Sequence, residues 1–474
     1  MNKRNLELIT DFYEFTMSNG YFVKNMNDIA YFDVFFRKIP DNGGFVIFTG
    51  LEQIIEFIEN LHFSEEDISY LREQNIFSEN FLNYLKNFKF TGDVWAIPEG
   101  TVVFPNEPLI TVRAPIIEAQ LLETMILLTI NHQSLIATKT RRIVNQAKQC
   151  PIMEFGARRA HGANAAVYGA RAAIIGGAVG TSCTLSAKEF DVPVSGTMAH
   201  SWIQSFDSEY EAFKAYAEIY PNNCTFLIDT YNTLESGLPN AIKVFEEVLK
   251  PMGIRPVAVR LDSGDLAYLS KEVRKKLDEA GYPDCKICAT NSLDERLISS
   301  LFEQDAKIDL FGVGENLITA KSDPVFGGVY KLVALEKNGN IIPKIKISEN
   351  VIKVTNPSFK KVYRFYSKDD NKALADLITL HDEEVFEGEY TIFDPANTWK
   401  KKILKNYYVK ELQTKIFENG KLVYTTPSLK EIAKYSENDL NTFWEEIKRL
   451  DNPHKYFVDL SQNLWNLKQE LLNK

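Results

Sequence analysis

The sequence Val257-Ala-Val-Arg-Leu-Asp-Ser-Gly-Asp265 passes from an apolar run to charged and polar residues, and an amphipathic stretch follows it as far as Ala280. This order recurs between Pro193 and Asn316 at intervals of about 30 residues, the length of a strand with its crossover helix. The other apolar runs of the series begin at Val192, Thr225, Lys286 and Ile308. Strands that alternate with helices in this way predict a parallel βα barrel or an open parallel sheet.

Polar residues follow each of these predicted strands. In parallel barrels and sheets, the reacting groups lie at the C-terminal ends of the strands. The polar residues at these ends are His200, Asp229, Arg260, Asp262 and Asn291. Because they converge on one mouth, the sequence predicts an active site there.

The chain has 474 residues, more than a single hydrophobic core usually accommodates. We therefore expect two or more domains. We predict a mixed N-terminal α/β domain over residues 1–130 and a βα barrel over residues 131–335. A C-terminal region of hairpins and then helices, over residues 336–474, is expected to pack with the N-terminal domain. The predicted fold class is therefore α/β, an irregular βα barrel with a second mixed domain built from the N- and C-terminal segments.

Three turns predict hairpins outside the repeat. Pro40-Asp-Asn-Gly-Gly44 separates the apolar stretches Ala30–Lys38 and Phe45–Phe48. Asn338-Gly339 and Asn419-Gly420 are dipeptides typical of two-residue hairpin loops. Each turn is expected to pair the strands on either side of it.

The composition is that of a folded globular protein, with 45% hydrophobic, 12% aromatic and 25% charged residues. A net charge of −10 and a pI near 5.4 argue against a nucleic-acid partner, whose phosphates attract basic surfaces. No apolar stretch approaches the roughly 20 residues of a membrane span, and no signal peptide follows Met1, so we expect a cytoplasmic enzyme. Five cysteines in so long a chain predict no disulfide framework, and Cys285 and Cys288 are expected to be buried in a strand.

The stretch Arg260–Asp265 has both a functional and a structural interpretation. An arginine and carboxylates at a strand end can hold a diphosphate and ribose hydroxyls. Ser263 or Asp265 can instead simply cap the helix that follows. Arg260 and Asp262 favour function, because a charged pair at the end of an apolar strand needs a partner.

Further candidates are weaker when taken singly. A lone histidine such as His200 is more often structural, but beside these charged residues it is a candidate general base or phosphoryl acceptor. Gly156-Ala-Arg158-Arg159 and Gly312-Val-Gly314 are of an anion-binding type, because glycine exposes backbone N–H groups. Either glycine motif alone is equally typical of a plain tight turn.

Several motifs stand in the order and spacing of one family. They are Thr10-Asp-Phe-Tyr-Glu-Phe-Thr-Met17, Glu154-Phe-Gly-Ala-Arg-Arg-Ala160, Gly196-Thr-Met-Ala-His-Ser201, Val259-Arg-Leu-Asp-Ser-Gly-Asp-Leu266 and Gly327-Gly-Val-Tyr-Lys-Leu-Val333. Through them the chain resembles nicotinate phosphoribosyltransferases, strongly over about residues 7–335 and loosely beyond.

The resemblance implies the first step of NAD salvage from nicotinate. Nicotinate, phosphoribosyl pyrophosphate, ATP and water would give nicotinate mononucleotide, pyrophosphate, ADP and phosphate, through a phosphohistidine. Such ATP-coupled ligases require Mg²⁺, which is bound with the pyrophosphate groups. The resemblance also implies a homodimer whose subunits share their active sites.

The resemblance also implies residue roles. His200 would be the histidine that ATP phosphorylates, and Asp262 would hold the ribose hydroxyls. Phe155 and Tyr13 would enclose the pyridine ring, with Tyr13 coming from the neighbouring subunit. The remaining substrate contacts would come from Arg158, Thr197, Asp229, Arg260, Gly312 and Gly314. No metal ligand is assigned.

Two features of the sequence bear on substrate and phosphate binding. A relative that uses nicotinamide is expected to place an aspartate near the ring, and Gly180-Thr-Ser-Cys-Thr184 contains none, which favours the carboxylate substrate. Glu315 stands where the human-type family pattern has threonine, and since a carboxylate cannot donate to phosphate, it is expected to face magnesium or turn away. The alternatives are a barrel transferase acting on nicotinamide or on another phosphorylated sugar, and a protein that binds a metabolite without turnover.

Overall fold

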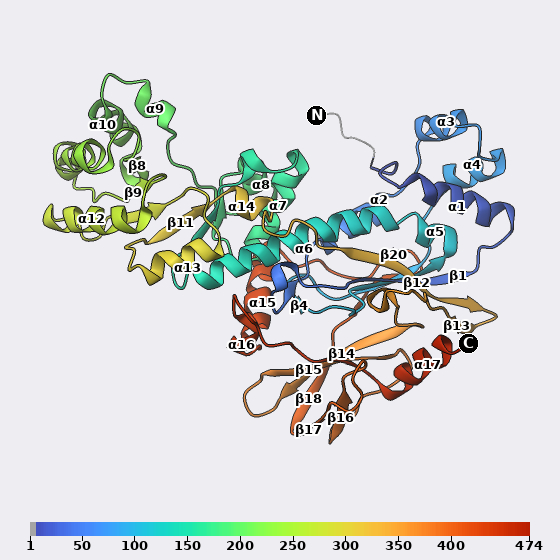
Figure 1. Cartoon of the computed structure of the whole chain (residues 1–474). Coiled ribbons are helices and arrows are strands. Elements are labelled where there is room, and N and C mark those ends of the chain that lie inside the picture. The colour runs from blue at the N-terminus through green and yellow to red at the C-terminus, as the bar shows by residue number, and fades with distance from the viewer. Residues whose placement is uncertain (1–5) are drawn as a thin grey trace. The chain divides into compact units, whose positions relative to one another are not determined.

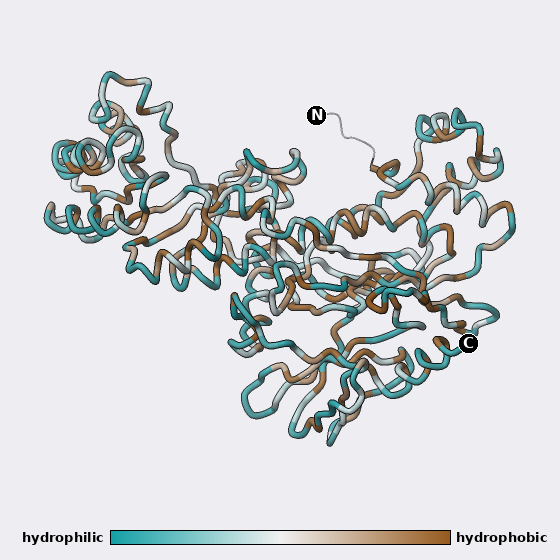
Figure 2. The backbone as a smooth tube through the Cα atoms, viewed as in Figure 1, coloured by the Kyte–Doolittle hydropathy of each residue, from teal (hydrophilic) through white to brown (hydrophobic). Residues whose placement is uncertain are grey.

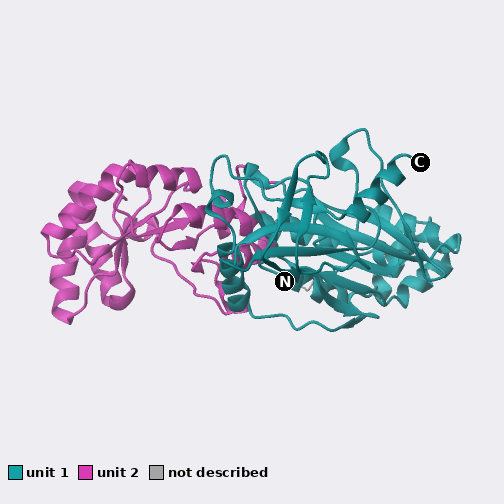
Figure 3. Ribbon diagram, turned by 90° about the horizontal axis from the view of Figure 1, so that it is seen from below, with its two compact units in different colours: residues 1–135, 325–474 teal, residues 136–324 magenta. Residues whose placement is uncertain are grey.

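The computed structural model describes residues 6–474, so residues 1–5 of the predicted N-terminal domain lie outside the described residues. The chain divides into two compact units, which Figure 3 draws in different colours. Unit 1 comprises Met1–Leu135 and Val325–Lys474, and unit 2 comprises Ile136–Pro324. Unit 2 is a continuous piece of chain, whereas unit 1 is assembled from both terminal segments.

A parallel sheet lies within unit 2 (Figure 1). Its strands lie in the order β7-β6-β11-β10-β9-β8. Their bounds are β6 (Ile152–Glu154), β7 (Gly180–Thr181), β8 (Thr225–Leu227), β9 (Ala258–Leu261), β10 (Lys286–Ala289) and β11 (Leu310–Val313). Because every neighbouring pair is parallel, the carboxyl ends of all these strands meet at one edge.

The apolar run that begins at Val192 is the exception in the predicted series of strands. It forms only an isolated parallel bridge between Val194 and Thr181. Pro193 lies in the middle of the run and has no N–H to donate to a ladder. Its carbonyl accepts from the backbone N–H of Thr181 at 3.0 Å, so the run extends the sheet by this short contact.

Helices separate the strands of unit 2. Their bounds are α7 (Ala163–Ile175), α8 (Thr184–Phe190), α9 (His200–Gln204), α10 (Glu209–Ile219), α11 (Leu238–Val244), α12 (Leu266–Glu279), α13 (Glu295–Glu303) and α14 (Glu315–Ile318). The long helix α6 (Glu123–Gln146) crosses the boundary between the units. Asp265 caps α12, since its side chain accepts from the backbone N–H of Tyr268 at 3.0 Å, which confirms the structural interpretation of this residue.

An antiparallel sheet occupies unit 1, in the strand order β13-β12-β1-β5-β3-β19-β20. The bounds are β1 (Ile29–Phe36), β3 (Asp93–Ala96), β5 (Ile110–Pro115), β12 (Gly328–Lys337), β13 (Asn340–Pro343), β19 (Thr414–Glu418) and β20 (Lys421–Leu422). The N-terminal strands β1, β5 and β3 lie together in the middle of this sheet, and strands of the C-terminal segment flank them on both sides. With the parallel sheet of unit 2, this arrangement confirms the predicted α/β fold class.

Smaller sheets and helices complete unit 1. A four-stranded sheet has the order β18-β14-β15-β21, β16 pairs with β17, and β2 pairs with β4. These strands are β2 (Val46–Ile47), β4 (Val102–Val103), β14 (Lys360–Ser367), β15 (Ala373–Leu380), β16 (Tyr390–Phe393), β17 (Lys401–Leu404), β18 (Tyr407–Glu411) and β21 (Val458–Leu460). The helices are α1 (Phe12–Val23), α2 (Leu51–Asn60), α3 (Glu65–Glu73), α4 (Glu79–Lys86), α5 (Ile116–Gln120), α15 (Leu429–Asn441), α16 (Glu445–Lys448) and α17 (Gln462–Leu472).

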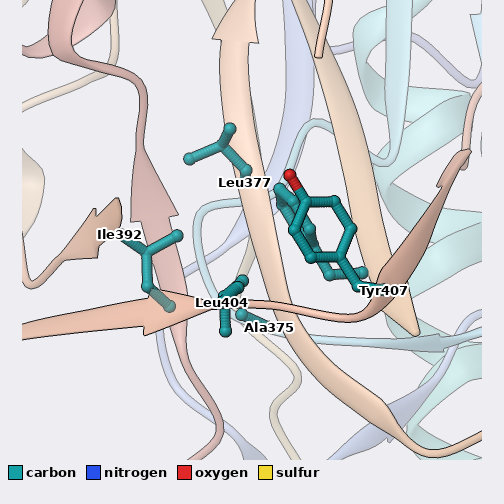
Figure 4. Packing of buried hydrophobic residues seen from close by; sticks show 6 residues of the cluster. Ala375, Leu377, Ile392, Leu404 and Tyr407 are labelled. Carbon is teal, nitrogen blue, oxygen red and sulfur yellow. The ribbon is translucent and has the colours of Figure 1, made fainter. Parts of the chain in front are cut away.

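Hydrophobic residues run along the central strands, as the brown segments of Figure 2 show. One buried cluster in unit 1 joins the four-stranded sheet to the β16–β17 hairpin (Figure 4). Its members are Phe365, Ala375, Leu377, Ile392, Leu404 and Tyr407.

Among the described residues, no helix has both the length and the apolar character needed to cross a membrane.

Two of the three predicted hairpins are confirmed. The turns at Asn338-Gly339 and Asn419-Gly420 join β12 to β13 and β19 to β20, and all four residues have positive φ, as type I′ turns require. The hairpin predicted around Pro40–Gly44 is wrong, because β1 pairs with β12 and β5 instead of β2. β1 is buried along almost its whole length, so it needs a full-length neighbour on each side, which a two-residue strand cannot provide.

Candidate active site

The loops after β8 and β9 are tied together by an aspartate. Oδ2 of Asp229, two residues beyond β8, accepts from the backbone N–H of Asp262 at 2.9 Å and from the hydroxyl of Ser263. Parallel pairing sets this contact, since Leu227 and Arg260 lie opposite each other in the ladder. Oδ1 of Asp229 is buried and has no hydrogen-bond partner within residues 6–474.

The guanidinium of Arg260 is held on all three of its nitrogens. Nε donates to the Thr290 hydroxyl at 3.0 Å, and Nη2 donates to Oδ1 of Asp262 at 2.9 Å. Nη1 donates to the hydroxyl of Thr197 at 2.8 Å and to the carbonyl of Met198 at 3.2 Å. The guanidinium has five N–H donors, and the described residues accept from four of them. The remaining N–H, on Nη2, is available to a ligand.

Asp262 is an ionised carboxylate in this setting. Burial disfavours its charge, but the hydrogen bond from Thr290, the charge of Arg260 and that of His200 outweigh it and hold the pKa of Asp262 below its usual value. Its Oδ1 is occupied by Arg260 and Thr290. Its Oδ2 lies on the side of His200 and is the oxygen left for a ligand hydroxyl.

His200 lies between the loops that follow β8 and β9. It is the first residue of α9, and its Nδ1 is 3.0 Å from the hydroxyl of Thr230. Its Nε2 is 3.8 Å from Oδ2 of Asp262. The His200 side chain is 40% exposed, so the imidazole is positioned by neighbours and yet accessible to a substrate.

Phe155 packs beside Gly312 and Gly314, where β6 and β11 end. A Cβ on Gly312 would lie 2.5 Å from Cδ2 of Phe155 and 2.7 Å from Cγ2 of Thr290. A Cβ on Gly314 would lie 3.1 Å from the Phe155 carbonyl oxygen. Gly312 therefore allows a close approach of an aromatic ring and a threonine methyl, and it is more than a turn residue.

The carboxylate of Glu154 supports this end of the site. It accepts from the backbone N–H of Gly156 and from the Thr181 hydroxyl, at 2.6 Å in the latter case. Burial, only partly offset by these hydrogen bonds, raises the pKa of Glu154. Glu154 thus joins β6 to β7 and fixes the turn from which Phe155 projects.

Two arginines occupy the turn after β6, and Glu315, the first residue of α14, lies near one of them. Arg158 is exposed and has no hydrogen-bond or ion-pair partner within residues 6–474, so its charge is available to an anion. Nε of Arg159 lies 3.7 Å from Glu315, which also receives the Nζ of Lys321 at 2.8 Å. Lys321 and then Arg159 lower the pKa of Glu315. Glu315 therefore faces two cations at this turn.

Tyr13 is the predicted site residue that belongs to unit 1, in helix α1. Its side chain is 45% exposed. Partial burial and the charges of Glu123 and Glu14 raise the pKa of its phenol. The other predicted site residues all belong to unit 2.

Sequence reasoning predicted Thr197 but missed two other hydroxyl groups of the site, those of Thr230 and Thr290. Thr230 contacts His200 and Thr290 contacts Arg260 and Asp262, whereas the predicted Asn291 is exposed, with φ of 87°, and has no side-chain partner among residues 6–474. The available signal was a β-branched hydroxyl residue at the end of an apolar strand.

Cys285 and Cys288 are buried and free, at 0% and 2% exposed, so the interpretation as buried cysteines of the strand region is confirmed. In the described part of the chain, no group of three or more His, Cys, Asp or Glu side chains could hold a metal ion.

Comparisons with known proteins agree along the whole chain. The nicotinate phosphoribosyltransferase N-terminal domain matches residues 8–131, the nicotinate phosphoribosyltransferase family matches residues 150–377, and the C-terminal domain matches residues 359–468. A nicotinate phosphoribosyltransferase of Bacillus subtilis is 45% identical over 471 residues, which cover 99% of this chain and 96% of the relative. One from Mycobacterium tuberculosis is 45% identical over 357 residues, 75% of either chain.

Solved structures are similar too. The crystal structure of human nicotinic acid phosphoribosyltransferase has a TM-score of 0.87 at 28% identity, covering 98% of this chain and 99% of that one. A nicotinate-nucleotide pyrophosphorylase from Pyrococcus furiosus has a TM-score of 0.72 at 25% identity, covering 93% and 98%.

Proposed function

The chain belongs to the nicotinate phosphoribosyltransferase family and transfers a phosphoribosyl group to nicotinate, and we propose that the residues at the carboxyl ends of β6 and β8–β11 carry out this reaction. The observation that carries the proposal is the bonded group of Arg260, Asp262 and Asp229, with the His200 imidazole 3.8 Å from Asp262. Three segments contribute to it, namely the ends of β8 and β9 with the residues that follow them, and the start of α9.

The transfer needs a stabilised sugar and a neutralised leaving group. The pyridine nitrogen of nicotinate forms a bond to the anomeric carbon while the bond from that carbon to pyrophosphate breaks, and positive charge develops on the ribose. Asp262 is ionised and its Oδ2 would accept from the ribose hydroxyls. The remaining N–H of Arg260 and the hydroxyl of Thr197 would donate to the phosphoribosyl group, and the backbone at Gly312 and Gly314 would contact its phosphate.

Phe155 and Arg158 would bind the nicotinate. The Phe155 ring, fixed against Gly312, would stack on the pyridine, and the unengaged guanidinium of Arg158 would meet its carboxylate. The absence of an aspartate between Gly180 and Thr184 fits a negatively charged substrate. Nicotinate should therefore be strongly preferred to nicotinamide.

His200 would accept the γ-phosphoryl group of ATP. An imidazole nitrogen forms the bond to phosphorus, ADP leaves, and water later takes the phosphoryl group to release phosphate. An accessible side chain beside the Thr230 and Thr197 loops supports this role. In this scheme ATP hydrolysis strengthens substrate binding, while the glycosidic chemistry rests on Arg260 and Asp262.

Magnesium would be held by Asp229 together with the pyrophosphate oxygens. The buried Oδ1 of Asp229 has no hydrogen-bond partner among the described residues, and a carboxylate oxygen is the ligand that Mg²⁺ prefers. Mg²⁺ usually takes only one or two carboxylates beside substrate phosphates, so no larger acidic cluster is needed. When bound, it supplies positive charge to the leaving pyrophosphate.

Tyr13 would complete the site from a second copy of the chain, in a homodimer acting in the cytoplasm. The phenol ring is almost half exposed in the single chain, as a ring that stacks on a substrate of the neighbouring subunit would be.

A product assay tests the proposed function. The purified protein is incubated with nicotinate, phosphoribosyl pyrophosphate, ATP and Mg²⁺, and nicotinate mononucleotide is separated by chromatography. Parallel reactions replace nicotinate by nicotinamide, or omit ATP. Turnover of nicotinate with slower synthesis when ATP is omitted is expected. Turnover of nicotinamide at a comparable rate would contradict the ring-binding assignment, and synthesis unaffected by ATP would contradict the coupling.

A further inference from the structure

Thr290 lies at the junction between the charged residues and the aromatic ring of the site. It directly follows β10, and its backbone N–H continues the ladder by donating to the carbonyl of Leu261 at 2.9 Å. Its side chain is almost fully buried, at 4% exposed. Both branches of this side chain therefore face other parts of the protein.

The hydroxyl branch connects two charged groups. Its oxygen accepts from Nε of Arg260 at 3.0 Å, and its proton points to Oδ1 of Asp262. The Leu261 carbonyl is a second acceptor at 3.3 Å, but an ionised carboxylate is the stronger one and lies closer. Since Nη2 of Arg260 also donates to Oδ1, the three side chains form a closed ring of hydrogen bonds.

The methyl branch points the other way, toward Gly312. A Cβ added to Gly312 would lie 2.7 Å from Cγ2 of Thr290 and 2.5 Å from the ring of Phe155. The methyl group and the ring thus pack on the same glycine. Serine would keep the hydroxyl and lose this packing, and valine would keep the packing and lose the hydroxyl.

We propose that Thr290 is a positioning residue that fixes Arg260 and Asp262 for phosphoribosyl transfer through its hydroxyl and holds them in register with the pyridine site through its methyl group. With Oδ1 of Asp262 engaged, Oδ2 is the oxygen presented to the ribose. With Nε of Arg260 engaged, the guanidinium plane cannot rotate, and its remaining N–H keeps one direction. This inference rests on the proposed function of Arg260 and Asp262.

Thr290→Val and Thr290→Ser form a matched pair that separates the two branches. Thr290→Val should lower kcat/KM for phosphoribosyl pyrophosphate roughly 10- to 100-fold, the range for misplaced reacting groups, with little change in the KM for nicotinate. Thr290→Ser should retain most of the kcat and raise the KM for nicotinate instead. Equal losses in the two variants would overturn the proposal.

The division of the losses between the two substrates is a readout that a purely structural role does not move. A general loosening of the site would change kcat and both KM values in either variant. A fall in kcat/KM for phosphoribosyl pyrophosphate in Thr290→Val with an unchanged KM for nicotinate is therefore specific to the hydroxyl group.

Folding is controlled by measuring Tm and the far-UV circular dichroism spectrum of each variant. If Thr290→Val does not fold, Thr290→Cys is compared with Thr290→Ser, because both lack the methyl group and the thiol is the poorer donor. The kcat/KM of Thr290→Cys for phosphoribosyl pyrophosphate should then fall below that of Thr290→Ser. A wild-type chain without nicotinate turnover would contradict the proposed function itself. An active wild type whose Thr290 variants behave alike would contradict only the role of Thr290.

Discussion

Nε2 of His200 lies 3.8 Å from Oδ2 of Asp262, so the candidate phosphoryl acceptor and the candidate ribose-binding carboxylate are direct neighbours. A phosphoryl group on this imidazole would bring negative charge close to the carboxylate. The two charges would then compete for the cations at the site, including Arg260. This arrangement gives a physical route by which phosphorylation changes how the site holds phosphoribosyl pyrophosphate.

His200→Asn should abolish ATP hydrolysis and the stimulation by ATP, while slow ATP-independent synthesis continues. Asparagine keeps a hydrogen-bonding group of similar size but cannot be phosphorylated. Incubation with γ-labelled ATP should label the wild type, and the label should be lost in acid and kept in base, as for a phosphoramidate. His161→Asn, in the same unit, is the control and should label normally. Wild-type labelling of His200→Asn would assign the phosphoryl group to another residue.

Arg260→Ala should cost about 2–4 kcal/mol of transition-state stabilisation, the range for losing a desolvated contact to developing charge. The measurement is kcat/KM for phosphoribosyl pyrophosphate. Arg255→Ala is the matched control, because Arg255 is exposed and pairs with Asp284 at the opposite end of this strand region. It should stay close to the wild type. Full activity of Arg260→Ala would remove Arg260 from the reaction.

Tyr13→Ala and His200→Ala should each be inactive in ATP-coupled synthesis and should recover activity when their subunits are mixed. If Tyr13 serves the neighbouring site, each mixed dimer carries one site with both residues intact. Equal mixing should then restore roughly a quarter of the wild-type rate, since half of the dimers are mixed. Two batches of Tyr13→Ala mixed together form the control. No recovery after proven subunit exchange would place Tyr13 outside the neighbour's site.

Glu14→Gln should stabilise the protein at alkaline pH. Burial, opposed by the hydrogen bond from Thr124 and assisted by the charges of Glu123 and Asp11, raises the pKa of Glu14 to about 8. Between the pKa of the unfolded state and about pH 8, the Glu14 carboxyl is protonated in the folded protein and ionised in the unfolded chain. Its contribution to stability is therefore complete below the unfolded pKa and is lost as pH rises through about 8.

Thermal unfolding tests this dependence. Glu14→Gln should exceed the wild type by a few degrees in Tm at pH 9 and by clearly less at pH 6. Glu437→Gln, at an exposed position of α15, controls for the loss of a surface charge. A difference between Glu14→Gln and the wild type that does not change with pH would show that Glu14 is already ionised.

Local patterns in the sequence predicted most strands of the parallel sheet of unit 2, but they missed β7 and placed a strand at Val192, where only a bridge forms. β8 and β9 are short and apolar, and polar groups follow each within a few residues, so Arg260, Asp262 and Asp229 could be assigned to one edge. Parallel pairing is what brings them together, and it follows from the crossover helices. The structure joins these residues directly, because the Arg260 guanidinium donates to the Asp262 carboxylate and the backbone N–H of Asp262 donates to the Asp229 carboxylate.

Contacts between distant segments could not be predicted in the same way. The partners of β1 come from both ends of the chain, and no turn adjacent to β1 reveals them. The choice between Thr290 and Asn291 depends on a single position, because successive residues at a strand end point in opposite directions. The hydroxyl contacts of Thr230 and Thr290 exist only once separate loops have met.

The pairing of N-terminal strands with C-terminal strands in the large sheet of unit 1 has a consequence for synthesis on the ribosome. The hydroxyl of Tyr31 in β1 donates to Glu336 in β12, which lies 305 residues later in the chain. While unit 2 is being translated, the edge of β1 that later pairs with β12 has no partner strand. Unpaired edges of apolar strands are prone to aggregate. Unit 2 is continuous and can fold as soon as it emerges, so the nascent chain should pass through a state in which the later domain is complete and the earlier one depends on chaperones.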